Sequence, residues 1–308
     1  MRQKTIKRDI SCSGIGLHSG KKVTLTLRPA PEDTGIIFVQ KGEQGKTMIS
    51  LSPDKVISTG LATTIGHNGV PIATVEHLLG AIYGLDLDNL YVEVSGEELP
   101  IMDGSAASFV FLLRSAGIRK QGKPKKVLAF TRPVHFRDGN KWINVQPYQG
   151  LKVKYTIEFD HPMIGRQEFE FKHSPENFIR MVAKARTFGF FKDVEKLQQM
   201  GLALGGSLDN AVVLDDYGVI NPEGLRFDDE LVRHKILDFI GDMAVMGLPL
   251  WGAFEVHCSG HAFNNAFLRF VHKHQDDFLN LITLDTDTLP QSRQSEQVTL
   301  PQPEPVLA

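Results

Sequence analysis

The stretch RFDDELVRHKILDFIGDMAVMG, residues 226–247, decides how the rest of the sequence is interpreted. At 3.6 residues per turn, its apolar residues fall on one broad face of a helix, while three polar residues follow the opposite side at successive i, i+4 steps. The apolar residues are Val232, Ile236, Phe239, Ile240, Met243 and Ala244. The polar residues are His234, Asp238 and Asp242. We therefore expect one face to pack against the core and the other to present its side chains.

His234 and Asp238 are one helical turn apart, so both side chains can reach a single metal ion. Two histidines at the same spacing bind zinc in HExxH enzymes. Asp242 lies one further turn along, where it is either a third ligand or a residue that orients one. An ordinary amphipathic helix with a solvated polar stripe has the same pattern, so this spacing alone leaves both interpretations open.

Length and composition favour a globular protein with two domains. A chain of 308 residues is long enough to build two hydrophobic cores. Its 2 cysteines, Cys12 and Cys258, are too few for a disulfide framework and favour a reducing compartment. The beginning, MRQKTIKRDI, is basic but is not followed by the apolar segment of a secretory signal. We expect a cytoplasmic protein.

The sequence predicts neither a membrane span nor a nucleic-acid-binding surface. The longest apolar run, residues 243–254, is interrupted by glycine and proline and is well short of the ~20 residues that cross a bilayer. The 34 basic and 36 acidic residues nearly balance, which gives no general electrostatic attraction for nucleic acid. An anionic ligand would need a local cluster of positive charge.

The order of sequence patterns predicts an α+β fold made of two tandem two-layer α/β sandwich domains of similar topology. In the first half, we expect strands over 22–28, 36–40 and 89–95 and helices over 74–84 and 105–116. In the second half, we expect strands over 126–130, 141–146, 151–159, 167–171 and 253–257 and helices over 175–185 and 228–246. The strand at 36–40 is expected beside the strand at 22–28. Two similar units in tandem place the active site in the cleft between them.

Changes in composition predict the domain boundaries. Residues 119–126, RKQGKPKK, are basic and lack apolar residues, as is typical of a linker. It would join an N-terminal domain, residues 1–120, to a C-terminal domain, residues 127–284. The glycine-rich residues near 188–226 are typical of an insertion. The tail, residues 285–308, is rich in Pro, Gln and Ser, and we expect it to be partly disordered.

A catalytic zinc ion usually takes three protein ligands and leaves its fourth position to water. His77, His234 and Asp238 would supply these ligands from both halves of the chain. Glu76, next to a ligand but not itself one, would be the general base. His261 would stabilise an oxyanion or protonate the leaving nitrogen. Each residue taken alone is also typical of a surface or a turn, so a non-catalytic nucleotide- or lipid-binding module is the alternative.

Seven segments together resemble the UDP-3-O-acyl-N-acetylglucosamine deacetylases, the zinc amidases that commit Gram-negative bacteria to lipid A synthesis. In order over residues 1–280, they are CSGIGLHSGKKVTLTLRPAPEDTGI, TVEHLLGAIYGLDLDN, LPIMDGSAASFVFLL, KARTFGFFKDVEKLQ, GGSLDNAVVLDD, LRFDDELVRHKILDFIGD and SGHAFNNAF. The resemblance implies the two-sandwich fold and hydrolysis of the N-acetyl group of UDP-3-O-(3-hydroxyacyl)-N-acetylglucosamine to the amine and acetate. An amidase of the same architecture that acts on another acylated amino sugar is the alternative.

The resemblance also implies a role for each matching residue. The zinc ligands fall on His77, His234 and Asp238, the general base on Glu76 and the catalytic imidazolium on His261. Asp242 would orient His261 or a ligand, and Thr187 would help to hold the carbonyl oxygen. The remaining matches are Lys235 and Asp193 near the UDP part, Phe188 and Phe190 along the sugar and nucleotide site, and His18 close to the metal.

The implied substrate has an anionic diphosphate at one end and an acyl chain at the other. Lys235 would meet the first, and the insertion, with Leu202, Ala203 and Leu204, would form an apolar passage for the second. Two imidazoles and a carboxylate suit either Zn²⁺ or ferrous iron, and we expect Zn²⁺. We expect a monomer that contacts the membrane surface only transiently.

Overall fold

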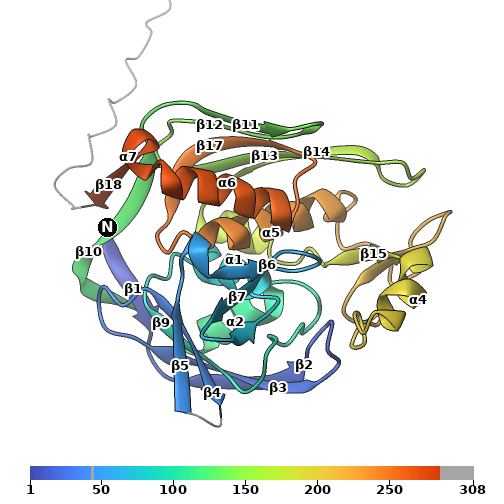
Figure 1. Ribbon diagram of the computed structural model, residues 1–308, viewed down its shortest axis with the longest axis horizontal. Coiled ribbons are helices and arrows are strands. Elements are labelled where there is room, and N and C mark those ends of the chain that lie inside the picture. Colours follow the sequence, from blue (N-terminus) through green and yellow to red (C-terminus); the bar gives the residue numbers. More distant parts are fainter. Residues whose placement is uncertain (43–44, 285–308) are drawn as a thin grey trace, which may run out of the picture.

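The computed structural model describes residues 1–42 and 45–284 and consists of four layers, with a sheet on each outer side and helices between them (Figure 1). One outer sheet has five strands. Their order across the sheet is β2 (Ile10–Ile15), β3 (Lys22–Pro29), β9 (Leu90–Val94), β4 (Ile36–Gly42) and β5 (Gly45–Ser50). In β3 every second residue is buried, which directs one face of this sheet towards the helices and the other towards solvent.

The second outer sheet repeats this arrangement around β17 (Leu250–His257). Over residues 252–257 its neighbours are β12 (Lys141–Gln146) and β13 (Leu151–Phe159), with β11 (Val134–Asp138) beyond β12 and β14 (Gly165–Lys172) beyond β13. The central strand of each arrangement runs antiparallel to one of these neighbours and parallel to the other. Strand β9 is antiparallel to β3 and parallel to β4, and β17 is antiparallel to β12 and parallel to β13. This shared topology agrees with the predicted α+β fold of two similar units.

Each central strand is preceded by one helix and followed by another. In the first half these are α1 (Glu76–Gly84) and α2 (Ala107–Ser115). In the second half they are α5 (Glu230–Ala244) and α6 (His261–Lys273). The two helix pairs face each other, so that α1 packs against α5 in the middle of the molecule (Figure 1).

The predicted helix over 228–246 is present as α5, but it does not present a polar face to solvent. His234, Asp238 and Asp242 are all buried, because α1 covers the side of α5 that faces away from its own sheet. Glycine permits this close approach. A Cβ atom added to Gly241 would lie 2.0 Å from the carbonyl oxygen of Glu76. The first turn of α1 therefore lies directly beside the polar residues of α5.

Two expectations about the strands are wrong. Residues 119–126 do not form an irregular linker but lie within β10 (Ile118–Phe130), which pairs with β1 (Arg2–Ile6), β17 and β18 (Leu279–Leu284). Backbone pairing with β1 needs no apolar side chains, so their absence did not indicate a loop. Strands β3 and β4 are not neighbours either, because β9 lies between them and pairs with both. The division into two domains remains a prediction, and the tail, residues 285–308, lies outside the described residues.

The remaining elements are short and border the site or the surface. The first half adds η1 (Pro53–Lys55), β6 (Val56–Ser58), β7 (Thr64–His67) and β8 (Val70–Ile72), and the second half adds α3 (Pro175–Met181) and α7 (Gln275–Phe278). Within residues 1–42 and 45–284, none of the helices combines the length and the apolar character that a bilayer span requires.

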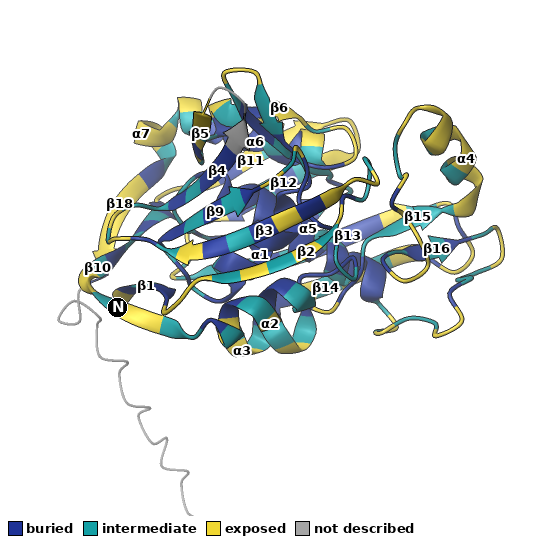
Figure 2. Cartoon of the chain, turned by 90° about the horizontal axis from the view of Figure 1, so that it is seen from below, coloured by how far each residue is buried: buried dark blue, intermediate teal, exposed yellow. Residues whose placement is uncertain are grey.

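The predicted insertion forms a lobe that stands out from the body of the molecule (Figure 2). It contains β15 (Phe188–Phe190), α4 (Phe191–Gln199) and β16 (Val212–Leu214), with β15 and β16 paired in parallel. Several of its apolar residues are exposed, including Phe191 at 60%, Met200 at 64% and Tyr217 at 87%. Exposed apolar side chains gathered on one part of a surface commonly mark a binding site.

Candidate active site

Two imidazoles and a carboxylate meet where α1 packs against α5. His77 Nε2 lies 3.4 Å, and His234 Nε2 3.2 Å, from the same atom, Asp238 Oδ1. All three side chains are buried, and one potential ligand atom from each lies within 4.8 Å of the others. Within the described residues, Asp238 Oδ1 has no hydrogen-bond partner. Since a buried carboxylate oxygen requires a donor or a cation, this group fits a bound metal ion.

The surroundings hold both ligands from α5 in orientations that suit a metal. His234 Nδ1 donates a hydrogen bond of 3.0 Å to the backbone oxygen of Ala185, which leaves Nε2 as the ring's ligand atom. The buried Arg186 anchors this backbone, because its backbone N–H and its Nε both donate to Glu230 at 2.9 Å. Lys235 Nζ donates at 2.9 Å to the other oxygen of this carboxylate, Asp238 Oδ2.

Glu76 lies beside the metal-binding group and is buried. Its Oε2 accepts a hydrogen bond of 3.1 Å from the backbone N–H of Thr63, and its Oε1 lies 3.8 Å from His261 Nε2. Burial raises the pKa of Glu76 to about 7, although the nearby His261 opposes this effect. A carboxylate with a pKa near neutrality is suited to take up and release a proton.

His261 is the first residue of α6 and is held by Asp242. Its Nδ1 donates a hydrogen bond of 2.9 Å to Asp242 Oδ2. Asp242 also accepts from Thr63 Oγ1 at 2.6 Å and from Asn264 Nδ2 at 2.8 Å. Burial alone would lower the pKa of His261, but the charge and hydrogen bond of Asp242 outweigh it and raise this pKa to about 10. His261 therefore carries a proton at neutral pH, with Nε2 directed towards Glu76.

These groups open into a cleft with a volume of about 350 Å³. The predicted site residues that line it are His18, Glu76, His77, Thr187, Phe188, Lys235, Asp238 and His261. His18 reaches the cleft from a loop. The Glu98 carboxylate holds this loop, because it accepts a hydrogen bond of 2.8 Å from the backbone N–H of His18. Neither ring nitrogen of His18 has a hydrogen-bond partner within the described part of the chain. Burial lowers the pKa of His18, although the nearby charge of Glu98 opposes this effect.

The structure does not bring every predicted residue into the cleft. Asp193 lies on α4 with its side chain exposed and is not among the residues that line the cleft. Phe190 packs against Phe159, with 5.8 Å between ring centroids, and against His161 at 5.7 Å, whereas Phe188 lies at the cleft beside Lys235. The roles of all these residues remain predictions.

The sequence patterns did not reveal several residues that organise the site. Thr63 bonds to both Glu76 and Asp242, yet nothing in its neighbourhood, LATTIG, distinguishes it. Lys141 lines the cleft from β12, where it was expected only as part of a strand. Asn264 could have been found, because it follows His261 by three residues and so lies on the same face of a helix.

Comparison with known proteins gives a consistent result over almost the whole chain. Residues 3–273 match a family model described as LpxC, UDP-3-O-acyl N-acetylglycosamine deacetylase.

Three similar proteins carry the name UDP-3-O-acyl-N-acetylglucosamine deacetylase. The one from Oleidesulfovibrio alaskensis is 60% identical over 284 residues, which cover 92% of this chain and 93% of that protein. The one from Nitratidesulfovibrio vulgaris is 58% identical over 284 residues, 92% of each chain. The one from Acidithiobacillus ferrooxidans is 50% identical over 278 residues, 90% of this chain and 91% of that protein.

Proposed function

Because the chain belongs to the family of UDP-3-O-acyl N-acetylglycosamine deacetylases, and is thus a hydrolase, we propose that it removes the N-acetyl group of UDP-3-O-(3-hydroxyacyl)-N-acetylglucosamine with the help of a bound Zn²⁺ ion. The observation that carries this proposal is the convergence of His77, His234 and Asp238 beside Glu76 and His261. The products would be the free amine and acetate, in the committed step of lipid A synthesis.

His77, His234 and Asp238 would hold the metal ion. Three protein ligands of this kind are typical of catalytic zinc, and the unpartnered Asp238 Oδ1 between two imidazole nitrogens supports the assignment within the described structure. When bound, zinc lowers the pKa of water and polarises a carbonyl group. Lys235 would balance the charge of Asp238 and keep its second oxygen occupied.

Glu76 and His261 would perform the proton transfers. Glu76, ionised in part at neutral pH, would take a proton from the attacking water. His261, protonated at that pH, would stabilise the developing oxyanion and then donate its Nε2 proton to the leaving nitrogen. Asp242 would keep His261 in the required orientation by accepting its Nδ1 proton in a hydrogen bond. The 3.8 Å between Glu76 Oε1 and His261 Nε2 lets both groups act at one carbon atom.

The residues that line the cleft and the insertion beside it suit the two ends of the proposed substrate. Lys235 and Lys141 supply positive charge for the diphosphate, and Thr187 supplies a hydroxyl group for the acetamide carbonyl. The insertion also reaches the cleft, where the Leu204 N–H donates to the His18 backbone oxygen at 3.1 Å. Its exposed apolar residues would receive the acyl chain and contact the membrane surface transiently. Zinc rather than ferrous iron, a cytoplasmic location and a monomeric state belong to the proposal as predictions.

The experiment that tests this function uses Glu76→Gln, a change that keeps the size of the side chain and leaves the three ligands intact. We expect purified Glu76→Gln to retain one zinc ion per chain but to lose about 100-fold or more in kcat on the UDP-linked substrate, because a general base contributes that much. Glu170→Gln, on the exposed face of β14, is the matched control and should have the activity of the unmodified protein. Retention of more than about a tenth of kcat would contradict the assignment of the base.

The same assay tests the substrate. Activity on the acylated sugar should fall strongly when the UDP group is absent, since the substrate then lacks the anionic diphosphate that Lys141 and Lys235 would attract. Equal activity on both compounds would favour an amidase for another acylated amino sugar.

A further inference from the structure

A second set of metal-binding side chains lies at one end of the C-terminal sheet, outside the group described above. Glu158, His257 and Cys258 each offer one potential ligand atom, and these atoms all lie within 4.8 Å of one another. Glu158 is on β13 and His257 on β17, which run parallel with Thr156 opposite His257. The pairing of β13 with β17 therefore brings Glu158 and His257 to the same end of the sheet, and Cys258 directly follows β17.

Neighbouring residues orient the carboxylate and the imidazole towards each other. Arg166 Nη1 donates to Glu158 Oε1 at 2.8 Å, whereas Glu158 Oε2 lies 3.8 Å from His257 Nε2. The His257 ring stacks on Trp142, with 5.4 Å between centroids and 7° between planes, so its orientation is fixed. One oxygen and one nitrogen thus face the same space, as they would around a bound cation.

Cys258 completes the set through an uncommon backbone conformation. Its φ is 49°, in the left-handed region that residues other than glycine seldom adopt, and its N–H donates to the Thr156 backbone oxygen at 2.9 Å. Partial burial raises the pKa of the Cys258 thiol, and hydrogen bonding from the Glu158 backbone opposes this. A metal ion that binds the sulfur would displace its proton to solvent, as metal ligation by cysteine requires.

The donor set indicates which cation would bind. Mg²⁺ and Ca²⁺ prefer oxygen ligands only, whereas sulfur, imidazole nitrogen and carboxylate oxygen together suit Zn²⁺ and similar thiophilic divalent ions. Three protein ligands near the surface would leave the fourth position to water. We propose that Glu158, His257 and Cys258 form a second metal site, which takes Zn²⁺ or a chemically similar divalent ion. This site does not depend on the proposed deacetylation.

The site adjoins the cleft through the chain that follows it. Cys258 precedes His261 by three residues, and the Tyr155 hydroxyl group donates to the backbone oxygen of Ser259, between them, at 2.8 Å. Lys141, next to Trp142 on β12, lines the cleft. The proposed metal site is therefore joined to His261 by a short segment that Tyr155 holds.

The test uses Co²⁺ as a spectroscopic probe, because a cobalt–thiolate bond produces an intense ultraviolet charge-transfer absorption that nitrogen and oxygen ligands do not. The full chain, loaded beforehand with one zinc ion, is titrated with Co²⁺ under a phosphine reductant. Since His77, His234 and Asp238 include no sulfur, exchange of Co²⁺ into that group cannot produce this absorption. We expect the absorption to saturate at one equivalent of thiolate-bound cobalt.

The two cysteines provide a matched pair of variants. Cys258→Ser should abolish the absorption, whereas Cys12→Ser, which removes the other cysteine of the sequence, should leave it unchanged. His257→Ala should weaken Co²⁺ binding measured by the same absorption, and far-ultraviolet circular dichroism checks that each variant is folded. Absence of the absorption in the unmodified chain, its persistence in Cys258→Ser, or an unchanged affinity in folded His257→Ala would each overturn the proposal.

Discussion

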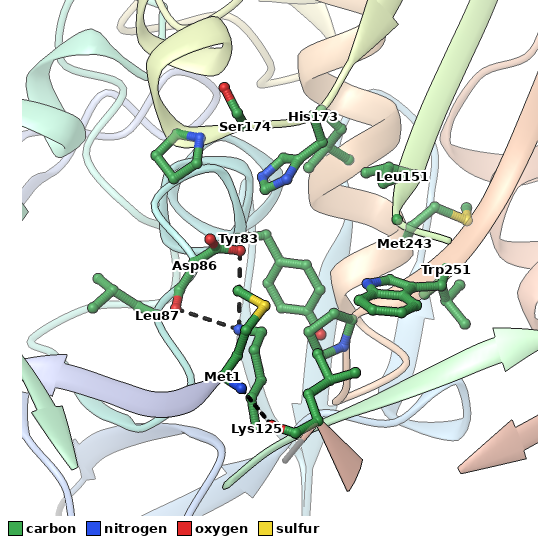
Figure 3. Close-up of a pocket in the computed structure, with 16 residues that line it drawn as sticks. Met1, Tyr83, Asp86, Leu87, Lys125, Leu151, His173, Ser174, Met243 and Trp251 are labelled. Carbon is green, nitrogen blue, oxygen red and sulfur yellow. Dashed lines mark hydrogen bonds and ion pairs between the residues drawn. The ribbon is translucent and has the colours of Figure 1, made fainter. Parts of the chain in front are cut away.

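Two hollows of similar volume are lined by residues from the same two helices, but the side chains that these helices contribute differ in chemistry. The cleft has a volume of about 350 Å³ and contains Glu76 and His77 from the first turn of α1, with Asp238 from α5. The second hollow, which we call the rear cavity, has a volume of about 310 Å³ and contains Tyr83 from the last turn of α1, with Met243 from α5 (Figure 3).

Volume does not identify the catalytic site, because the cleft and the rear cavity have similar volumes. The other rear-cavity residues are Met1, Asp86, Leu87, Lys125, Gly150, Leu151, His173, Ser174, Pro175, Ile240, Pro249, Leu250, Trp251 and Leu284. The charges there are already paired, since Lys125 Nζ lies 2.7 Å from Asp88 Oδ1 and 4.0 Å from Asp86 Oδ1. Beside the cleft, by contrast, buried titratable groups surround Asp238 Oδ1, which has no hydrogen-bond partner within the described residues. Unsatisfied buried charge distinguishes the site that performs chemistry.

The largest expected difference comes from replacing one histidine of the metal-binding group beside the cleft and one histidine that lines the rear cavity. His234→Ala should lose the metal ion, measured by elemental analysis, and more than about a thousandfold in kcat/KM, because the metal supplies several kcal/mol of transition-state stabilisation. His173→Gln in the rear cavity should retain both the metal and the activity. A full complement of metal in folded His234→Ala would remove the basis of the comparison.

A second substitution addresses the packing role of the rear cavity. Met243 is buried there, and Met243→Ala should lower the free energy of unfolding by about 2 kcal/mol, the lower end of the range for such changes, because the side chain already borders a hollow. Urea unfolding measures this loss, and kcat/KM per folded molecule should stay unchanged. A large fall in kcat/KM at full folding would instead reveal that the two hollows are coupled through α5.

Asp242→Asn tests the electrostatics of the cleft without removing a ligand. Asp242 raises the pKa of His261 against the opposing effect of burial, so its neutralisation should lower that pKa. Since His261 acts in its protonated form, the alkaline limb of the pH profile of kcat/KM should move to lower pH. Activity at neutral pH should fall by about tenfold or more, as is usual when the partner of a site histidine is lost. An alkaline limb that stays in place would show that His261 is not the group that limits activity there.

The smallest expected effect concerns the pH dependence of stability at the rear cavity. Burial lowers the pKa of His173, with Asp86 opposing, so the ring stays neutral in the folded protein where the unfolded chain already binds a proton. The contribution of His173 to the free energy of unfolding is therefore fully present above the unfolded pKa of about 6.5 and is lost as the pH falls below it. The melting temperature should fall less steeply on acidification in His173→Gln than in the unmodified protein. Parallel curves would contradict this source of acid sensitivity.

Much of the fold was predictable from local periodicity. The helix expected over 228–246 is present as α5, and the strands expected over 141–146 and 151–159 have the observed bounds of β12 and β13. Periodicity succeeds there because each element buries one continuous face. No helix was predicted for α6, where His261 was given a catalytic role with a turn residue as the alternative. Yet Phe263, Phe267 and Val271 recur there at four-residue intervals and are all buried.

Local sequence patterns were enough to identify the residue types that could perform the chemistry. Two residues one turn apart on α5, and a Glu–His pair on α1, already specified candidate ligands and a candidate base, because the helical repeat fixes which side chains share a face. The resemblance to a known family assigned their roles.

That these residues meet depends on how the whole chain packs. His77 and His234 lie far apart in the chain, and no local pattern indicates that Gly241 lets α5 approach the backbone of Glu76, or that Thr63 joins Glu76 to Asp242. These contacts depend on how the helix layers of the two halves pack, and residues far apart in the sequence determine that packing. The same packing separates β3 from β4 and makes residues 119–126 part of a strand, since partners in a sheet are chosen by space and not by sequence order.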